Sequence, residues 1–262
     1  MGKGGIENRV EQQLEADNKP FYANLRLGGL YDSRVGSASG GGDEDSDTAF
    51  AATLFAGWQA PLEGNFGLSL DYGGYADFHQ DFDEYDVIDQ SVSFEPQYIS
   101  GQSIYSMPFA FNYAMEDGET DYSKYTVSPT WTYLIPKTSQ AIAVYGIGSI
   151  IDDRDNSILD EDGEAIGAGC AYLLFFDNLS RIRLSLDYQH TKYDARVIDY
   201  DTPSVSTDKR EDDSIVAGVD VQYQFNKFFG IFTNYSFIHS NSNVDIYEYN
   251  RHIVEAGIAF KY

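Results

Sequence analysis

Apolar side chains occupy every second position through most of the chain from residue 20 onward. The final segment shows the pattern clearly, because Val254, Ala256, Ile258, Phe260 and Tyr262 alternate with polar or small residues. A period of two is typical of a β-strand with one apolar and one polar face. Twelve segments follow it, which predicts strands at residues 21–32, 48–58, 65–72, 92–98, 105–113, 124–133, 140–151, 164–176, 181–189, 214–225, 229–237 and 254–262.

Two features of these strands limit the prediction. The segment 140–151 does not show which of its faces points outward, whereas Ile166 and Cys170 of the next segment are expected to face outward. Pro96 and Pro129 fall inside predicted strands, where each removes a backbone donor from the ladder. The two prolines therefore affect the local pairing and leave the predicted number of strands unchanged.

The connections between these strands alternate strictly between short and long. Short turns on one rim and long loops on the other are typical of outer-membrane barrels, in which the short side is periplasmic. The pattern therefore predicts an all-β fold, a 12-stranded antiparallel transmembrane β-barrel over residues 20–262, with both termini in the periplasm. The short connections are 60–64, 100–101, 136–138, 177–179 and 226–227, and the long ones are 33–47, 76–86, 115–122, 152–164, 194–213 and 239–250.

Composition and charge agree with a barrel of this kind. The chain has no run of about 18 apolar residues, which excludes a transmembrane helix, and only alternate residues of a barrel strand face lipid. The six long connections carry net charges of −3, −5, −4, −6, −4 and −2, so they hold −24 of the total of −25. A soluble β-sandwich or lipocalin-like barrel needs neither this one-sided charge nor outward aromatics at strand ends, here Trp58, Tyr98, Trp131 and Tyr133.

Residues 1–19 stand apart from the strand pattern. Ile6, Val10 and Leu14 recur at the spacing of one helical face, which predicts a short periplasmic helix over residues 5–18. It is interpreted as a linker, as a plug of the lumen or as the last helix of an upstream domain. The first residues do not form a signal peptide, so we expect a mature chain or the end of a longer polypeptide.

The polar faces of the strands predict which side chains line the lumen. They carry basic and acidic groups in similar number, so the wall itself should select weakly between ions, whereas the acidic mouth should favour cations at low salt. Twelve strands lie between filled 8-stranded barrels and water-filled porins, so a salt-bridge network and a polar conduit both remain open. The predicted residues are Arg26, Asp71, Asp89, Glu95, Lys124, Arg181, Arg183, Asp187, Asp220 and Glu255.

No pattern in the chain indicates catalysis. The four histidines, His79, His190, His239 and His252, lack a serine or cysteine at a spacing that suggests a nucleophile with its base. The single cysteine, Cys170, excludes an internal disulfide. We therefore expect no enzyme, no cofactor and no nucleic-acid partner.

Carboxylates in two long connections resemble fragments of calcium loops. Asp43, Asp45 and Asp47 alternate in one connection, and Asp160 and Asp162 precede a glycine in another. Clustered carboxylates suit hard cations, although the distant Glu of a calcium loop is missing. Loose binding of divalent cations, which also bridge lipopolysaccharide, and a simple hydrated acidic surface both remain open.

Two parts of the sequence resemble known outer-membrane proteins. Glu255, Gly257, Phe260 and Tyr262 resemble the C-terminal signal that the barrel-assembly machinery reads. The stretch 25–35, with Tyr31-Asp32-Ser33-Arg34-Val35, and the stretch 234–251 resemble the first strand and last hairpin of barrels that follow periplasmic tetratricopeptide repeats. That group includes surface lipoprotein assembly modifiers and exopolysaccharide-export proteins, in which the motif usually has Asn where this chain has Arg34. The resemblance implies an export role and a periplasmic repeat or export partner.

The sequence thus predicts a transport or export pore in the Gram-negative outer membrane, in contact with lipid and lipopolysaccharide. A passive small-solute channel is the first alternative. A structural or surface-interaction barrel with acidic cation-binding loops is the second.

Overall fold

The computed structural model describes residues 20–35, 46–60, 64–116, 119–153, 162–176, 178, 180–198 and 205–262. Almost all of them lie in strands of one antiparallel sheet, with two single-turn 3-10 helices at Asp83–Tyr85 and Asp245–Tyr247. The predicted helix at residues 5–18, the proposed domain 1–19 and its boundary lie outside the described residues. The strands are β1 (Phe21–Asp32), β2 (Asp47–Gln59), β3 (Phe66–His79), β4 (Val87–Ser100), β5 (Ser103–Ser106), β6 (Phe109–Glu116), β7 (Glu119–Val127), β8 (Thr130–Leu134), β9 (Gln140–Asp153), β10 (Gly163–Phe175), β11 (Arg181–Ile198), β12 (Val205–Gln224), β13 (Phe229–Ser242) and β14 (Tyr249–Lys261).

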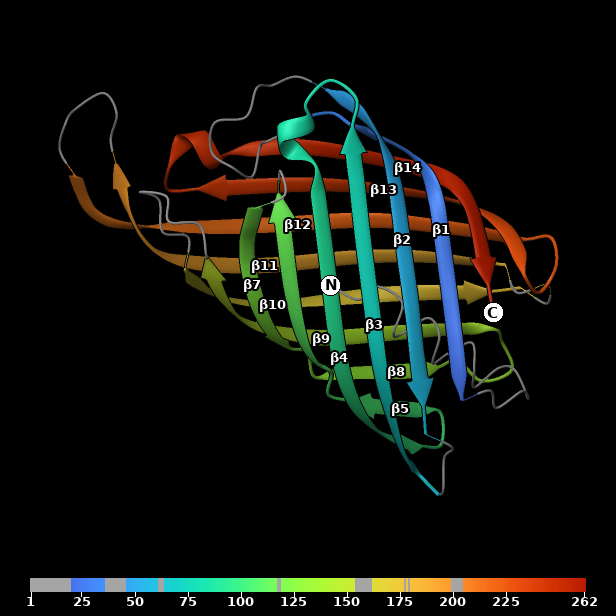
Figure 1. The fold of residues 1–262 in the computed structure, drawn as a ribbon. Coiled ribbons are helices and arrows are strands. Elements are labelled where there is room, and N and C mark those ends of the chain that lie inside the picture. Colours follow the sequence, from blue (N-terminus) through green and yellow to red (C-terminus); the bar gives the residue numbers. More distant parts are fainter. Residues whose placement is uncertain are drawn as a thin grey trace.

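The sheet closes on itself to form a barrel. β1 pairs with β14 from Asn24–Lys261 to Asp32–Ile253, which places the first and last strands side by side (Figure 1). β5 and β6 are two parts of one barrel strand that is interrupted at residues 107–108, and β7 and β8 are two parts of the next, interrupted at 128–129. The fourteen segments therefore make twelve barrel strands, which confirms the predicted fold class.

The alternation of apolar and polar residues is the alternation of outside and inside. Exposed large apolar side chains lie on the predicted outward positions of every barrel strand for which a face was predicted, as Phe50, Leu184 and Ile258 illustrate. The undecided strand, β9, places Ile142 and Val144 outward, whereas Ala141 and Ala143 face inward and are fully buried. Apolar side chains fill both faces of β9, so periodicity alone could not distinguish them.

Several predicted loops are strands in the structure. β11 and β12, of 18 and 20 residues, extend beyond the neighbouring strands at the end of the long connections (Figure 1). The predicted loops 115–122 and 194–213 are thus largely strand, and β3 runs on to His79. A transmembrane strand needs only about 9–11 residues, so these extensions run beyond the length that lipid covers and lack apolar alternation. For that reason the sequence prediction ended the strands too early.

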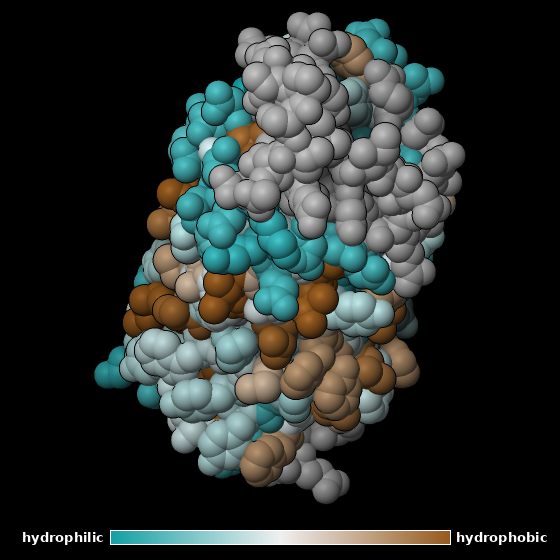
Figure 2. Space-filling view, turned by 90° about the vertical axis from the view of Figure 1, so that its left-hand side faces the viewer, coloured by the Kyte–Doolittle hydropathy of each residue, from teal (hydrophilic) through white to brown (hydrophobic). Residues whose placement is uncertain are grey.

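The short turns mark the opposite end of the barrel, which we call the short-turn end. Backbone φ angles in the left-handed region occur in these turns, at Gly64, Gly101 and Lys137. Gly101 belongs to the two-residue connection between β4 and β5, where hairpin turns favour positive φ. Within the described part of the chain, no helix is long and apolar enough to cross a membrane. Figure 2 shows hydrophilic side chains gathered around the upper part of the face in view, with apolar ones mainly below.

Candidate functional site: the barrel interior

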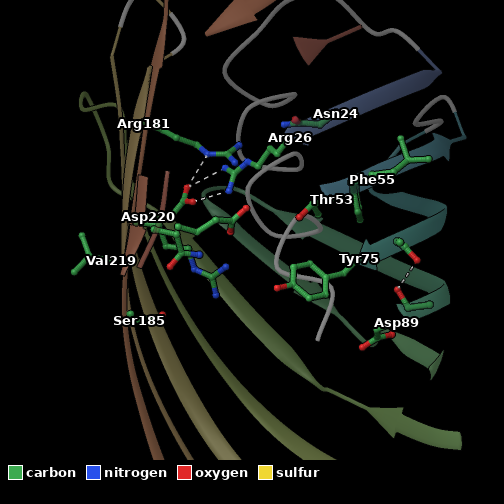
Figure 3. A pocket seen from close by; sticks show the side chains of 18 of the residues that line it. Asn24, Arg26, Thr53, Phe55, Tyr75, Asp89, Arg181, Ser185, Val219 and Asp220 are labelled. Atoms are coloured by element: carbon green, nitrogen blue, oxygen red, sulfur yellow. Dashed lines mark hydrogen bonds and ion pairs between the residues drawn. The ribbon is translucent and has the colours of Figure 1, made fainter. Parts of the chain in front are cut away.

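The inward side chains enclose a central cavity of about 300 Å³ within the barrel. Most of the residues that line it are polar or charged, in contrast to the apolar residues on the outer surface of the wall. Two sides of the barrel face each other across it: β1 with β11–β14, and β2 with β3, β4 and β6 (Figure 3). The lining residues that carry the argument below are Arg26, Arg181, Arg183, Asp220, Glu255 and Asp89.

A charged cluster around Asp220 holds one side of the cavity together. Arg26 Nη1 and Nη2 donate to the two Asp220 oxygens at 2.7 and 3.2 Å, and Nη2 also donates to Gln222 Oε1 at 3.0 Å. Arg181 Nε lies 3.7 Å from Asp220 Oδ1 (Figure 3). One carboxylate therefore joins arginines of β1 and β11 through a residue of β12. Such two-point contacts between guanidinium and carboxylate fix direction as well as charge.

The ring of Phe232 packs against the guanidinium group of Arg26. The Arg26 guanidinium carbon lies 4.7 Å from the centre of the Phe232 ring, within the range of a cation–π contact. The ring crosses Gly257 of β14 and reaches Gly28 of β1, where an added Cβ would come within 3.3 Å of it. Two glycines facing each other across the closing ladder thus leave the space that this aromatic ring occupies.

A row of tyrosine, glycine and aspartate occurs twice on the inner wall. Tyr145, Gly169 and Asp187 face each other on β9, β10 and β11, and the Tyr145 hydroxyl donates to Asp187 at 2.5 Å. Tyr22, Gly57 and Asp71 form the same row on β1, β2 and β3, again with a tyrosine–aspartate hydrogen bond. The middle glycine lets the phenol ring cross it, because a Cβ on either glycine would lie 2.5 Å from ring carbons. The close approach of the phenol ring explains the glycine at position 169.

The other side of the cavity is polar but carries fewer charges. Tyr75 of β3 and Asp89 of β4 point into the cavity from the side that faces Arg181 and Asp220 (Figure 3). The Tyr75 hydroxyl donates to Asp77 Oδ2 at 2.8 Å. Asp77 lies two residues further along β3, closer to the end of the long connections. The arginines and the tyrosine therefore lie on opposite walls of the same cavity.

The structure brings together part of the predicted lumen set. Arg26, Arg181, Arg183, Asp220 and Glu255 line the cavity, as does Asp89. The predicted residues Asp71, Glu95, Lys124 and Asp187 also lie on inward positions but outside the cavity lining, and Asp71 and Glu95 are buried. That any of these residues contacts a moving solute remains a prediction.

A second layer of ion pairs lies at the end of the long connections. Arg251 Nε donates to both oxygens of Asp32, at 2.8 and 3.0 Å, and the Asp32 side chain is 1% exposed. Arg210 donates to Asp212 at 2.6 and 2.9 Å and stacks on Tyr247. Strand periodicity did not single out these pairs, because it marks inward positions without showing which of them meet.

The proposed metal ligands do not form a site in the described part of the chain. Asp43, Asp45 and Asp160 lie outside the described residues, and no group of three metal-ligating side chains occurs within them. Asp47 is not a loop carboxylate as predicted: it begins β2, and its side chain is 1% exposed. Asp162 is half-buried beside the start of β10, where its carbonyl accepts from the Asp194 amide at 2.6 Å.

Two backbone amides and a histidine contact the side-chain oxygens of Asp47. The amides of Thr48 and Asp81 donate to them at 2.6 and 3.1 Å, and His79 Nδ1 lies at 3.3 Å. Burial alone raises the pKa of Asp47, but the amides of Asp81 and Thr48 and the charge of His79 outweigh it, so the pKa lies below its ordinary value. The folded barrel therefore favours the charged form of this carboxyl.

We expect Asp47→Asn to lower the melting temperature at neutral pH. Because the folded pKa is depressed, the carboxylate stabilises the barrel fully above the ordinary value of about 4 and loses this effect as the pH falls through its folded value. The gap between wild type and variant should thus narrow as the pH falls below about 4 and through the depressed folded pKa of Asp47. Thermal unfolding in detergent at a series of pH values measures it, with the exposed neighbour Asp81→Asn as the control. A gap that persists at the lowest pH would contradict this account.

The four histidines make local contacts at the end of the long connections. His190 Nδ1 lies 3.0 Å from Asp213 Oδ1, and His239 Nδ1 lies 2.9 Å from Asn250 Oδ1. His252 Nδ1 lies 2.9 Å from the Tyr235 hydroxyl. None of these contacts involves a serine or a cysteine.

The residues of the predicted assembly signal take different sides of β14. Phe260 and Tyr262 are exposed on the outer face, whereas Glu255 lines the cavity. Gly257 faces Phe232 on the neighbouring strand β13. The Tyr262 amide donates to Ala23 at 2.9 Å, so the last residue still belongs to the closing ladder. Recognition by the assembly machinery remains a prediction.

Sequence reasoning missed the inward aromatic residues. Tyr22, Tyr145 and Phe232 contact the charged or small residues described above, yet their residue type suggested the outer face or no role. The signal for Tyr22 was its position, because it is an even-numbered residue between the outward Phe21 and Ala23. No comparable signal existed for Tyr145 on the ambiguous strand β9.

Comparison with known proteins gives the fold alone. No family model and no curated protein matches the chain. Among solved structures it is similar to the COG4313 outer membrane channel from Pseudomonas putida F1, with a TM-score of 0.59 and 10% identity, over 96% of this chain and 98% of that chain. It is also similar to the NanC porin, with a TM-score of 0.50 and 8% identity over 89% and 98% of the two chains. The chain therefore has the fold of outer-membrane β-barrels.

Proposed function

We propose that this chain is a pore of the Gram-negative outer membrane that lets small polar solutes cross. The barrel exterior is an apolar surface that suits lipid, with aromatic residues near its borders. The long acidic connections would face outward, toward lipopolysaccharide, and the short turns and both termini would face the periplasm. Insertion by the barrel-assembly machinery through the C-terminal strand belongs to the same proposal.

The observation that carries this proposal is the polar cavity at the centre of the closed wall. A barrel that only needed to be stable could fill its interior with apolar side chains, as the stretch around Ala141, Ala143 and Leu173 does locally. The central cavity instead keeps about 300 Å³ between charged and amide side chains. Similarity to a structure described as an outer membrane channel supports the same function.

The test of conduction is the current across a planar bilayer that contains the refolded protein. We expect stable openings that favour cations weakly at low salt, because the acidic end concentrates cations. A cysteine placed at Ser91 in a Cys170→Ser background should let a charged methanethiosulfonate reagent reduce the current, since Ser91 lines the cavity. The wild type is the matched control, because its single cysteine, Cys170, is exposed on the outer face. An equal effect on both proteins, or none on Ser91→Cys, would contradict conduction through this cavity.

A second arm of the same experiment tests the role of residues 1–19. A chain that begins at residue 20 should conduct like the full chain if these residues are a linker. If they plug the lumen, openings should appear or widen only in the shorter chain. Silence of both chains would count against a passive pore and favour a structural barrel or a partner-dependent translocator.

A specific contact favours export as a second candidate function. The two stretches that resemble tetratricopeptide-linked barrels meet in the structure, where Arg251 pairs with Asp32 and the His252 amide donates to Ser33 Oγ at 2.8 Å. Arg34 donates through its amide to Asp32 Oδ1 at 2.9 Å, so its side-chain difference from the usual Asn leaves this contact intact. An exporter of the surface-lipoprotein or exopolysaccharide type would act with a periplasmic repeat domain. Loss of such material from the surface of cells that lack the protein would support this function, and an unchanged surface would contradict it.

A further inference from the structure

Three prolines lie side by side in one part of the barrel wall. Pro96 belongs to β4, Pro108 separates β5 from β6, and Pro129 separates β7 from β8. The carbonyl of each proline accepts a hydrogen bond from the next barrel strand: from the amides of Met107, Ser128 and Gly146, at 3.1, 3.0 and 3.0 Å respectively. The three prolines are therefore neighbours across consecutive strands.

Each of these contacts is half of a normal antiparallel pair. Two residues that face each other in such a pair exchange two hydrogen bonds, but proline has no amide hydrogen to return. The carbonyls of Met107, Ser128 and Gly146 thus receive no ladder bond from the facing proline. The Thr130 hydroxyl donates to Ser128 O at 2.9 Å and replaces one of the three.

We call this line of half-pairs the proline seam, defined by Pro96, Met107, Pro108, Ser128, Pro129 and Gly146. It lies in the lipid-facing part of the wall, because Tyr105, Phe109 and Tyr125 beside it are exposed outside. Backbone groups in lipid normally must be satisfied inside the protein, and prolines in sheets are mostly restricted to edges and bulges. Three prolines on one line, none of which can donate a ladder hydrogen bond, should make the strands easier to separate locally there.

The arginine ion pairs around Asp220, Asp212 and Asp32 lie away from the seam. The residues of these pairs belong to β1, β11, β12 and β14. On the inner face of β9 and β10, next to the seam, small and apolar side chains such as Ala141, Ala143 and Ala171 pack together. Movement of the wall from β4 to β8 would leave the contacts of Arg26 and Arg181 with Asp220 in place.

We propose that the proline seam is a flexing line of the barrel, along which the wall from β4 to β9 bends and changes the width of the lumen. The gating consequence rests on the proposed pore function, whereas the bending itself does not. Each missing ladder bond lowers the free energy needed to separate the two strands locally, and the loss is repeated on three adjacent ladders. The arginine-bearing side would stay fixed while the seam side moves.

Hydrogen exchange of the refolded wild type tests the bending directly. We expect the amides of Met107, Ser128 and Gly146 to exchange at least about tenfold faster than those in the β12–β13 ladder, since local opening controls exchange. A variant with Pro96→Ala, Pro108→Ala and Pro129→Ala regains three donors and should slow the exchange at these amides. Pro136→Ala is the matched control, because Pro136 lies in the turn between β8 and β9 and interrupts no ladder. Equal protection at the seam and in β12–β13, or no change in the triple variant, would overturn the proposal.

Channel recordings test the link between bending and lumen width separately from the pore function. If the wild type conducts, the triple variant should keep its main conductance and show fewer transient changes in current. Unchanged fluctuations would overturn the link between bending and lumen width. A silent wild type with fast exchange at the seam would contradict the pore function while supporting the flexing line. If the triple variant does not fold, Pro129→Ala alone should show the same change at Gly146.

Discussion

Replacing Gly28 or Gly257 with alanine is expected to prevent normal closure of the barrel. A Cβ on Gly28 would lie 2.5 Å from the Ala256 carbonyl oxygen, and a Cβ on Gly257 would lie directly against the Leu27 carbonyl oxygen. Both obstacles are backbone atoms of the facing strand, which cannot rotate away as a side chain can. Overpacking typically costs about 1–3 kcal/mol, and we expect the upper end or more here because the closing ladder must separate.

The measurement is the folded fraction after refolding into detergent, followed by unfolding in urea. Gly29→Ala is the matched control, because nothing lies within 4 Å of its added Cβ. Refolding without the assembly machinery separates packing from recognition, since Gly257 also belongs to the predicted assembly signal and Gly28 does not. Wild-type stability of Gly28→Ala would refute the packing argument. A defect of Gly257→Ala that appears only in cells would assign that glycine to recognition.

Replacing Asp220 with alanine is expected to lower the free energy of unfolding by about 3 kcal/mol, the typical loss when one partner of a buried ion pair is removed. Asp220 accepts from Arg26 and lies close to Arg181, with only 12% of its side chain exposed. Its removal leaves two guanidinium groups near each other without the carboxylate that separates them. The same variant should shift the pore toward anions, because the cavity loses a negative charge.

Urea unfolding and the reversal potential of the channel measure these two effects. Asp213→Ala is the control for stability: its pairing with His190 is exposed, and such pairs contribute about 0–1 kcal/mol. A double variant, Arg26→Met with Asp220→Leu, should recover much of the lost stability, because buried pairs can often be replaced by apolar residues. Equal losses for Asp220→Ala and Asp213→Ala would show that the cluster does not hold the barrel together.

The strand pattern predicted the wall well and the interior contacts poorly. Phe50, Leu184 and Ile258 were placed correctly because lipid imposes one simple rule, apolar outside, on every strand that crosses it. Asp47 was misplaced as a loop residue because above the membrane both faces of a strand are polar, so alternation no longer marks the end of the strand. The inward Tyr145 was missed because an aromatic residue inside a barrel has no periodic signature.

The sequence by itself determined the number of barrel strands, their order along the chain, the outward faces of all but β9 and the acidic end, since each of these follows from local alternation and charge. Only the tertiary structure decided which inward residues meet. Asp220 joins Arg26 across 194 positions of sequence, and Tyr145 reaches Asp187 over Gly169. Such contacts depend on the register and closure of the sheet, because a shift of one residue would turn every one of these side chains to the other face. The same register aligned three prolines into one seam, which no single segment of the chain could show.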